Sequence, residues 1–141
     1  LARPMPLDAT LDALLRSYEE EGGINHLDGS NLPSDESVNR LATDVMHLLF
    51  PGFFEHEPLR REDVAEVTRA RLHAVHARLR ADLEKSYRFS GHAEPAARAA
   101  QVTAETLASL PALRALVQTD VRAAYAGDPA ARSTEEIILA Y

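Results

Sequence analysis

Two aspartates near the end of the chain have the residue type and the setting to carry chemistry. Asp128 stands between Gly127 and Pro129, where a rigid turn would hold a short carboxylate in the fixed geometry that a charge-assisted hydrogen bond needs. The same position also suits a helix N-cap that is followed by proline in the first turn. From the residues alone, capping is the favoured role for Asp128.

Asp120 lies four residues after Leu116 and seven after Leu113, so it points along the apolar stripe of a predicted helix. A carboxylate in that position is costly unless it is paired or hydrogen-bonded. We expect a structural acid that meets an arginine or a helix N-terminus. The functional alternative is that Asp120 orients the turn around Asp128.

Six histidines raise the question of a metal site. His73 and His76 are three residues apart and could share an ion, but the nearest acids, Glu66 and Asp82, lie off that face or far along it. We therefore predict solvated surface histidines and no metal site. His26 lies in a polar loop, where helix capping or interface contacts are the default roles. Three more have no partner at a meaningful spacing: His47, His56 and His92.

Motifs and composition exclude several classes of function. The sequence contains no nucleophile–base arrangement, phosphate-binding glycine loop or dinucleotide fingerprint, so we predict no catalytic residue in these 141 residues. A net charge of −7 argues against nucleic-acid or anionic-membrane binding, which needs clustered cations. The lack of cysteine is compatible with a reducing cytoplasm, where we expect the protein. No apolar run approaches the ~20 residues of a membrane span.

Strong helix formers dominate and no segment alternates with period two, so the predicted fold class is all-α, with about five to six amphipathic helices in one compact domain. A first helix is predicted over about 8–21, from the stripe Leu11, Leu14, Leu15 and Tyr18. Ser34 is expected to cap a second helix. The third and longest helix is predicted over about 61–88.

Proline and glycine mark the other boundaries. Pro51 and Gly52 end the second helix, and Pro95 suits the first turn of a fourth helix. Pro111 is expected to start a fifth helix, which Gly127 stops.

The segment 133–136 predicts a capping box that starts one more helix. In it the Ser133 hydroxyl would accept from the Glu136 N–H, and the Glu136 carboxylate from the Ser133 N–H. The apolar stripe that follows stops with the chain, so we expect a further domain after residue 141. Five apolar residues are left without an evident cover: Phe53, Phe54, Ile137, Ile138 and Tyr141. Such a cluster predicts self-association, most simply as a two-fold dimer.

The stretch Leu116–Ser133, LVQTDVRAAYAGDPAARS, resembles the end of the helical N-terminal domain of serine O-acetyltransferases, which follows the pattern Asp-Val/Ile-x-Ala-x(4)-Asp-Pro-Ala. Upstream, Gly22–Ser34 and Leu48–Phe54 resemble the longer-armed bacterial branch of that family. The resemblance covers nearly the whole chain and thins before Leu11 and over 72–100.

This resemblance implies that residues 1–141 are the N-terminal domain of an enzyme that transfers acetyl from acetyl-CoA to L-serine, for cysteine biosynthesis. The catalytic histidine and the acyl-CoA groove of the family lie in a C-terminal β-helix of hexapeptide repeats, which we expect after residue 141. The 1–141 chain alone is therefore expected to be inactive. By the same resemblance, Asp128 contacts the serine ammonium group.

The resemblance also implies the partners. The helical domains of the family pack against one another across subunits, and cysteine synthase (O-acetylserine sulfhydrylase) is a candidate partner through the missing C-terminus. Acetyl-CoA would be a co-substrate of the full-length enzyme, and no cofactor is expected on this domain. The alternative function is a non-catalytic helical module for assembly or regulation of an acyltransferase-like protein.

Overall fold

The computed structural model describes residues 6–140, and this part of the chain contains helices and no strand. The predicted all-α fold is confirmed. The elements follow in the order α1 Leu7–Glu20, the short 3-10 helix η1 Gly22–Ile24, α2 Asp35–Leu49, α3 Val64–Phe89, α4 Pro95–Gly127 and α5 Thr134–Leu139.

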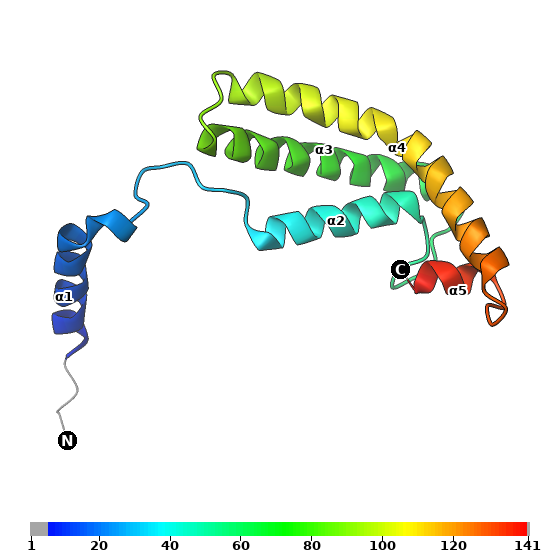
Figure 1. Ribbon diagram of the computed structural model, residues 1–141, viewed down its shortest axis with the longest axis horizontal. Coiled ribbons are helices and arrows are strands. Elements are labelled where there is room, and N and C mark those ends of the chain that lie inside the picture. Colours follow the sequence, from blue (N-terminus) through cyan, green and yellow to red (C-terminus); the bar gives the residue numbers. More distant parts are fainter. Residues whose placement is uncertain (1–5, 141) are drawn as a thin grey trace.

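Three helices form the body of the molecule, with α3 packed against both α2 and α4 (Figure 1). The tightest contact is between α3 and α4, where Val75, Ala99 and Thr103 are all fully buried. Alanine and threonine are small, so they let the two helix axes approach closely. The body therefore depends on a short list of buried residues along one face of α3.

Two polar contacts set the direction of α2 along α3. Ser34 caps α2 as predicted, because its hydroxyl accepts from the Ser37 N–H at 3.1 Å. The Ser37 hydroxyl in turn donates to Asp82 of α3 at 2.7 Å. Asp82 is buried, and burying a carboxylate is costly unless it is hydrogen-bonded. The first turn of α2 is thus held near the C-terminal end of α3, and the two helices run antiparallel.

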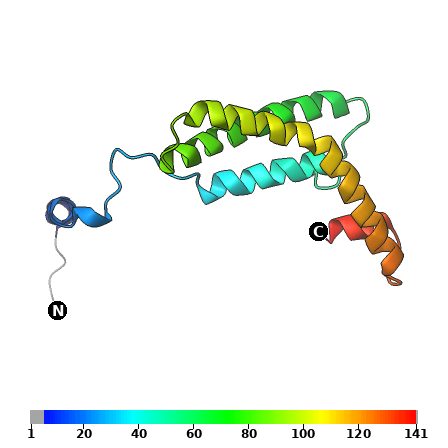
Figure 2. The same cartoon turned by 45° about the horizontal axis from the view of Figure 1, so that its top comes forward.

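The expectation that Pro111 starts a new helix is wrong, because α4 runs through it as one helix of 33 residues. A helix that started at Pro111 would need an N-cap at Leu110, which has no side-chain acceptor. The neighbouring Ser109 cannot serve instead, because its hydroxyl donates back to the Thr106 carbonyl at 2.7 Å. The cost of an internal proline appears as a bend, since it removes one backbone bond and crowds the preceding turn. Figure 2 shows α4 curving away from α3 in its second half.

The turn after α2 folds back on its own helix. Phe50 is buried, and its ring lies 6.4 Å from that of Phe53 and 6.1 Å from that of Phe54, both edge-on. Helix α5 folds back on α4, so Ile137 and Ile138 are half-buried. Three members of the expected uncovered cluster, Phe53, Ile137 and Ile138, are therefore half-buried by the chain itself, whereas Phe54 remains 36% exposed. The remaining member, Tyr141, lies outside the described residues.

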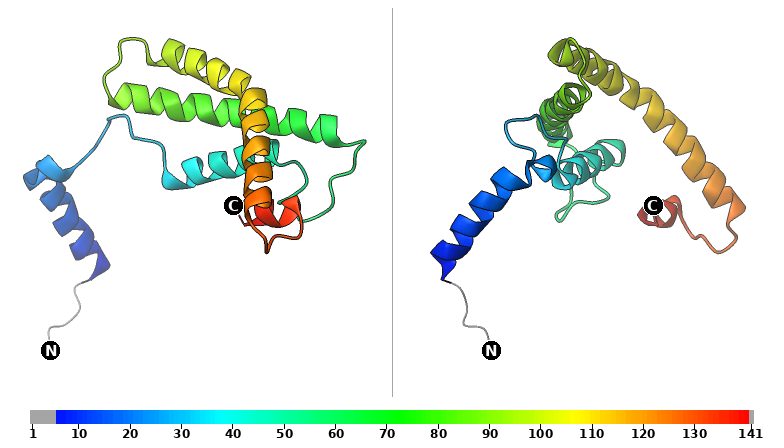
Figure 3. Two further views of the ribbon diagram at one scale, coloured as in Figure 1. Left: turned by 45° about the vertical axis from the view of Figure 1, so that its right-hand side comes forward. Right: turned by 60° about the vertical axis from the view of Figure 1, so that its left-hand side comes forward.

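Helix α1 stands apart from the body, as two further views show (Figure 3). Among residues 6–140, the short η1 that follows it is the one element against which α1 packs appreciably. The Asn25 side chain donates to the Tyr18 carbonyl at 2.6 Å and so caps the end of α1. His26 donates its Nε2–H to the Ser30 carbonyl at 3.0 Å, and its ring lies 6.1 Å from that of Phe89 at the end of α3. His26 thus ties the linker to the body.

Candidate functional site

The turn between α4 and α5 presents Asp128 to solvent on a fixed backbone. One carboxylate oxygen, Oδ1, accepts from the Ala130 N–H at 2.9 Å, and the Asp128 carbonyl accepts from the Ala131 N–H at 3.2 Å. Pro129 between them fixes its own φ. No helix begins here, so Asp128 closes a turn and is not the helix N-cap that the residues alone favoured. Within residues 6–140, Oδ1 is the Asp128 carboxylate oxygen that accepts a hydrogen bond inside this turn.

The far end of the turn contains the capping serine that was predicted, with one difference. Ser133 Oγ accepts from the Glu136 N–H at 3.4 Å, but Glu136 Oε2 accepts from the Arg132 N–H at 2.9 Å and not from Ser133. The pKa of Glu135 is lowered, first by its own backbone N–H and then by the Ser133 hydroxyl. The start of α5 is therefore held on both sides, which fixes the turn that contains Asp128.

Asp120 is exposed on α4, next to the buried Val121. The expected contact with an arginine or a helix N-terminus is not found within residues 6–140. The predicted stripe is split: Val121 faces the body, while Leu113 and Leu116 remain 41% and 64% exposed. Because α4 bends at Pro111, only part of the apolar face of its second half packs against the rest of the chain.

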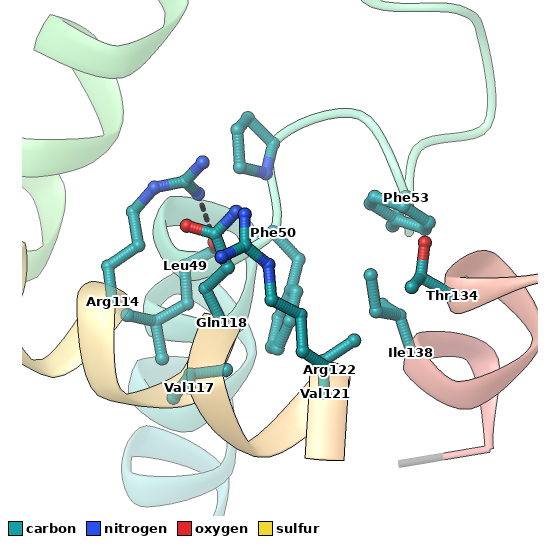
Figure 4. Close-up of a pocket in the computed structure, with 11 residues that line it drawn as sticks. Leu49, Phe50, Phe53, Arg114, Val117, Gln118, Val121, Arg122, Thr134 and Ile138 are labelled. Atoms are coloured by element: carbon teal, nitrogen blue, oxygen red, sulfur yellow. Dashed lines mark hydrogen bonds between the residues drawn. The ribbon is translucent and has the colours of Figure 1, made fainter. Parts of the chain in front are cut away.

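A cleft of about 380 Å³ lies beside the turn, between the end of α2, the second half of α4, and α5 (Figure 4). Its apolar walls are Leu49, Phe50, Pro51, Phe53, Val117, Val121 and Ile138, and its polar lining is Arg114, Gln118, Arg122 and Thr134. Arg114 donates to the Leu49 carbonyl at the end of α2. Neither Asp120 nor Asp128 is among the residues that line the cleft.

Sequence reasoning missed this cleft because three distant segments form it. The lining residues include no histidine, acid or cysteine, so the cleft offers cations and an apolar wall but no acid–base pair. The signal available beforehand was the Phe53–Phe54 pair, which had to fold back on a helix.

A half-buried ion cluster holds the aromatic turn in place. Arg71 Nη2 donates to Glu55 Oε2 at 2.7 Å, and Arg71 Nη1 forms an ion pair with Oε1 at 2.5 Å. His47 Nδ1 lies 3.5 Å from the same Oε1. The Arg71 guanidinium beside Glu55 holds the pKa of that carboxyl below its ordinary value, His47 adds to the effect, and burial opposes it. The expectation that His47 has no partner is wrong, because the turn at Pro51 and Gly52 brings Glu55 back to α2.

The other histidines show no metal geometry. His73 and His76 are exposed on α3, and the described residues contain no group of three or more potential ligands placed to hold a metal ion. The His92 ring packs edge-on against Tyr87, with centroids 4.7 Å apart. None of the helices within 6–140 has the length and apolar content needed to span a bilayer.

Comparison with known proteins agrees with the resemblance. The chain is 31% identical, over 119 residues, to a protein of Synechococcus elongatus named "Serine acetyltransferase, plasmid". Shared sequence thus links the chain to a serine acetyltransferase. The match covers 78% of the chain but 37% of the relative, so the chain spans little more than a third of that protein's length. No protein-family model matches the chain.

Proposed function

We propose that this chain is the helical N-terminal domain of a serine O-acetyltransferase, which transfers acetyl from acetyl-CoA to L-serine in cysteine biosynthesis. The observation that carries the proposal is the 31% identity over 119 residues to a serine acetyltransferase. The all-α fold is consistent with a domain that supports a separate catalytic unit. The domain would supply subunit contacts and one substrate-binding side chain, Asp128.

The geometry of the turn supports a binding role for Asp128. Its backbone is closed by the bond from Ala130 N–H to Oδ1, so the carboxylate has little freedom to lose when it binds a cation. An ammonium ion is a compact donor that suits such a carboxylate. In this proposal the serine ammonium binds at Asp128.

The test uses the full-length protein. Asp128→Ala should raise the KM for serine about ten- to a hundred-fold, because a charged hydrogen bond contributes roughly 1.5–3 kcal/mol. The KM for acetyl-CoA should stay nearly constant. Thiol release from acetyl-CoA at varied concentrations of each substrate measures both values.

Asp128→Asn is the matched control for the turn. Asparagine retains an oxygen that can accept from the Ala130 N–H but lacks the negative charge. If the charge binds serine, Asn and Ala should be equally impaired. Full recovery with Asn, or an equal loss for both substrates with Ala, would show that Asp128 serves only the turn.

A further inference from the structure

The apolar face of α1 lacks a partner in the described chain. Five large residues lie on this face, and each is at least 45% exposed: Leu7, Leu11, Leu14, Leu15 and Tyr18. An isolated helix of 14 residues is marginal in water, because its nucleation is costly. A continuous exposed stripe of this kind marks an interaction surface.

An acidic row borders this face on one side. Asp8, Asp12 and Glu19 each follow a member of the apolar row by one residue, which places them about 100° further round the helix. With four acids and one arginine, α1 has a net charge of −3. Packing one α1 on another would bring two helices of net charge −3 together, so a second α1 is a poor partner.

The outer face of α3 has the complementary pattern. An alanine row, Ala70, Ala74, Ala77 and Ala81, is exposed and repeats the spacing of Leu7, Leu11, Leu14 and Tyr18. A basic row, Arg69, His73, His76 and Arg80, is also exposed and precedes the alanine row by one residue. With six cationic residues and three acids, α3 has a net charge of +3 when its histidines are neutral.

We propose that α1 of one copy docks in parallel on the outer face of α3 in a second copy. On α1 each acid follows a residue of the apolar row by one position, whereas on α3 each base precedes an alanine by one position. When the apolar row packs against the alanine row, the acidic and basic rows therefore lie on the same side of the contact only if the two helices are parallel. The alanines leave room for the leucine side chains. In this register Asp8 meets Arg69, Asp12 meets His73 and Glu19 meets Arg80.

The contacts of the linker favour a second copy over the same chain. With Asn25 capping the end of α1 and His26 lying against Phe89, α1 stands apart from its own α3 (Figure 3). A helix of this length is about 21 Å long and gives a small contact by itself. A two-fold pair forms the contact twice, which brings the total closer to the ~1,200 Å² of a stable interface.

This inference deepens the self-association part of the proposed function and does not depend on acetyl transfer, so each can fail without the other. It is tested on the 1–141 chain by sedimentation velocity at micromolar concentration. The wild-type chain should dimerise, and salt should weaken the dimer, since charges at a surface are screened within about 10 Å at 0.1 M.

Charge reversal tests the contact itself. Asp8→Lys with Glu19→Lys on α1, or Arg69→Glu with Arg80→Glu on α3, should each raise the dimer Kd at least tenfold. A mixture of these two variants should recover the wild-type Kd, because each reversed helix then meets its opposite on the other copy. Circular dichroism should be unchanged, since all four side chains are exposed.

A matched single control uses the two sides of α1. Asp12→Lys lies in the acidic row and should weaken the dimer, whereas Glu20→Lys makes the same charge change away from the docking face and should not. A monomeric wild type, equal effects of the two changes, or a mixture that stays monomeric would each overturn the proposal. If the docking of α1 is restored only in a chain that contains both reversals, and that chain is monomeric, then α1 docks on the α3 of its own chain, which would also overturn the proposal.

Discussion

Helices α1 and α5 are both short amphipathic elements at the edges of the fold, but only α5 packs on the body. The longer of the two, α1, has 14 residues, begins after Pro6 without a side-chain cap, and leaves its apolar face exposed. Helix α5 has six residues, is capped by Ser133, and half-buries Ile137 and Ile138. Length and stripe therefore do not decide whether a helix packs; the surface available to it does.

The aromatic turn supplies that surface for α5. Phe53 and Ile138 line the same cleft close to each other, with Phe50 between them and α4 (Figure 4). The Glu55–Arg71–His47 cluster then holds the turn against α3. No comparable surface lies beside α1 in the described chain.

The largest expected effect is on the free energy of unfolding, and it distinguishes the three-helix body from α1. Phe50→Ala should lower the free energy of unfolding by about 3–5 kcal/mol, because it empties a buried site. Leu14→Ala on α1 should change it by less than about 0.5 kcal/mol, because that side chain is 45% exposed and unpacked. Urea unfolding at a concentration where the chain is monomeric measures both. A large loss with Leu14→Ala would mean that α1 packs on the body in solution.

The next effect concerns the cluster that positions the aromatic turn. Glu55→Gln should cost about 1.5–3 kcal/mol at neutral pH, since it removes charged hydrogen bonds in a half-buried site. Glu36→Gln is the control: Glu36 also faces an arginine, Arg40, but its side chain is 86% exposed, so we expect at most about 0.5 kcal/mol. Equal losses would mean that the cluster adds no more than a surface pair.

The same cluster makes stability depend on pH. The pKa of Glu55 is lowered from its ordinary 4.5, so the unfolded chain binds the proton first as the pH falls. The stabilisation is complete above pH 4.5 and is lost as the pH falls through the lower, folded-state pKa. Unfolding free energies measured between neutral and acidic pH should fall for the wild type more steeply than for Glu55→Gln. Parallel curves would contradict this account.

The smallest expected effect is local to α5. Ser133→Ala removes the hydroxyl that accepts from Glu136 and should cost about 1 kcal/mol. Amide exchange should quicken in α5 and remain unchanged in α3. Because α1 has no side-chain cap at Pro6, its amides should exchange faster than those of α5 in the monomer. Slower amide exchange in α1 than in α5 would contradict the conclusion that α5 is the better-packed helix.

The sequence by itself determined the elements that local chemistry controls. Ser34 and Ser133 have side-chain acceptors in the right place, so both caps were predictable. The stripe from Leu11 to Tyr18 established α1, and Pro51 with Gly52 ended α2. These features depend on residues within one or two turns of each other. The Gly127–Pro129 turn was predictable for the same reason.

Only the tertiary structure decided what depends on distant residues. Pro111 lies inside α4 because its neighbours offer no cap and both halves of the helix find surfaces to pack on. The partner of His47 is Glu55 because a turn reverses the chain, and the burial of Asp82 depends on a hydroxyl 45 residues away. A stripe in the sequence specifies which face of a helix is apolar, but burial of that face requires a surface built from other parts of the chain. For α5 the fold supplies that surface, and for α1 it does not.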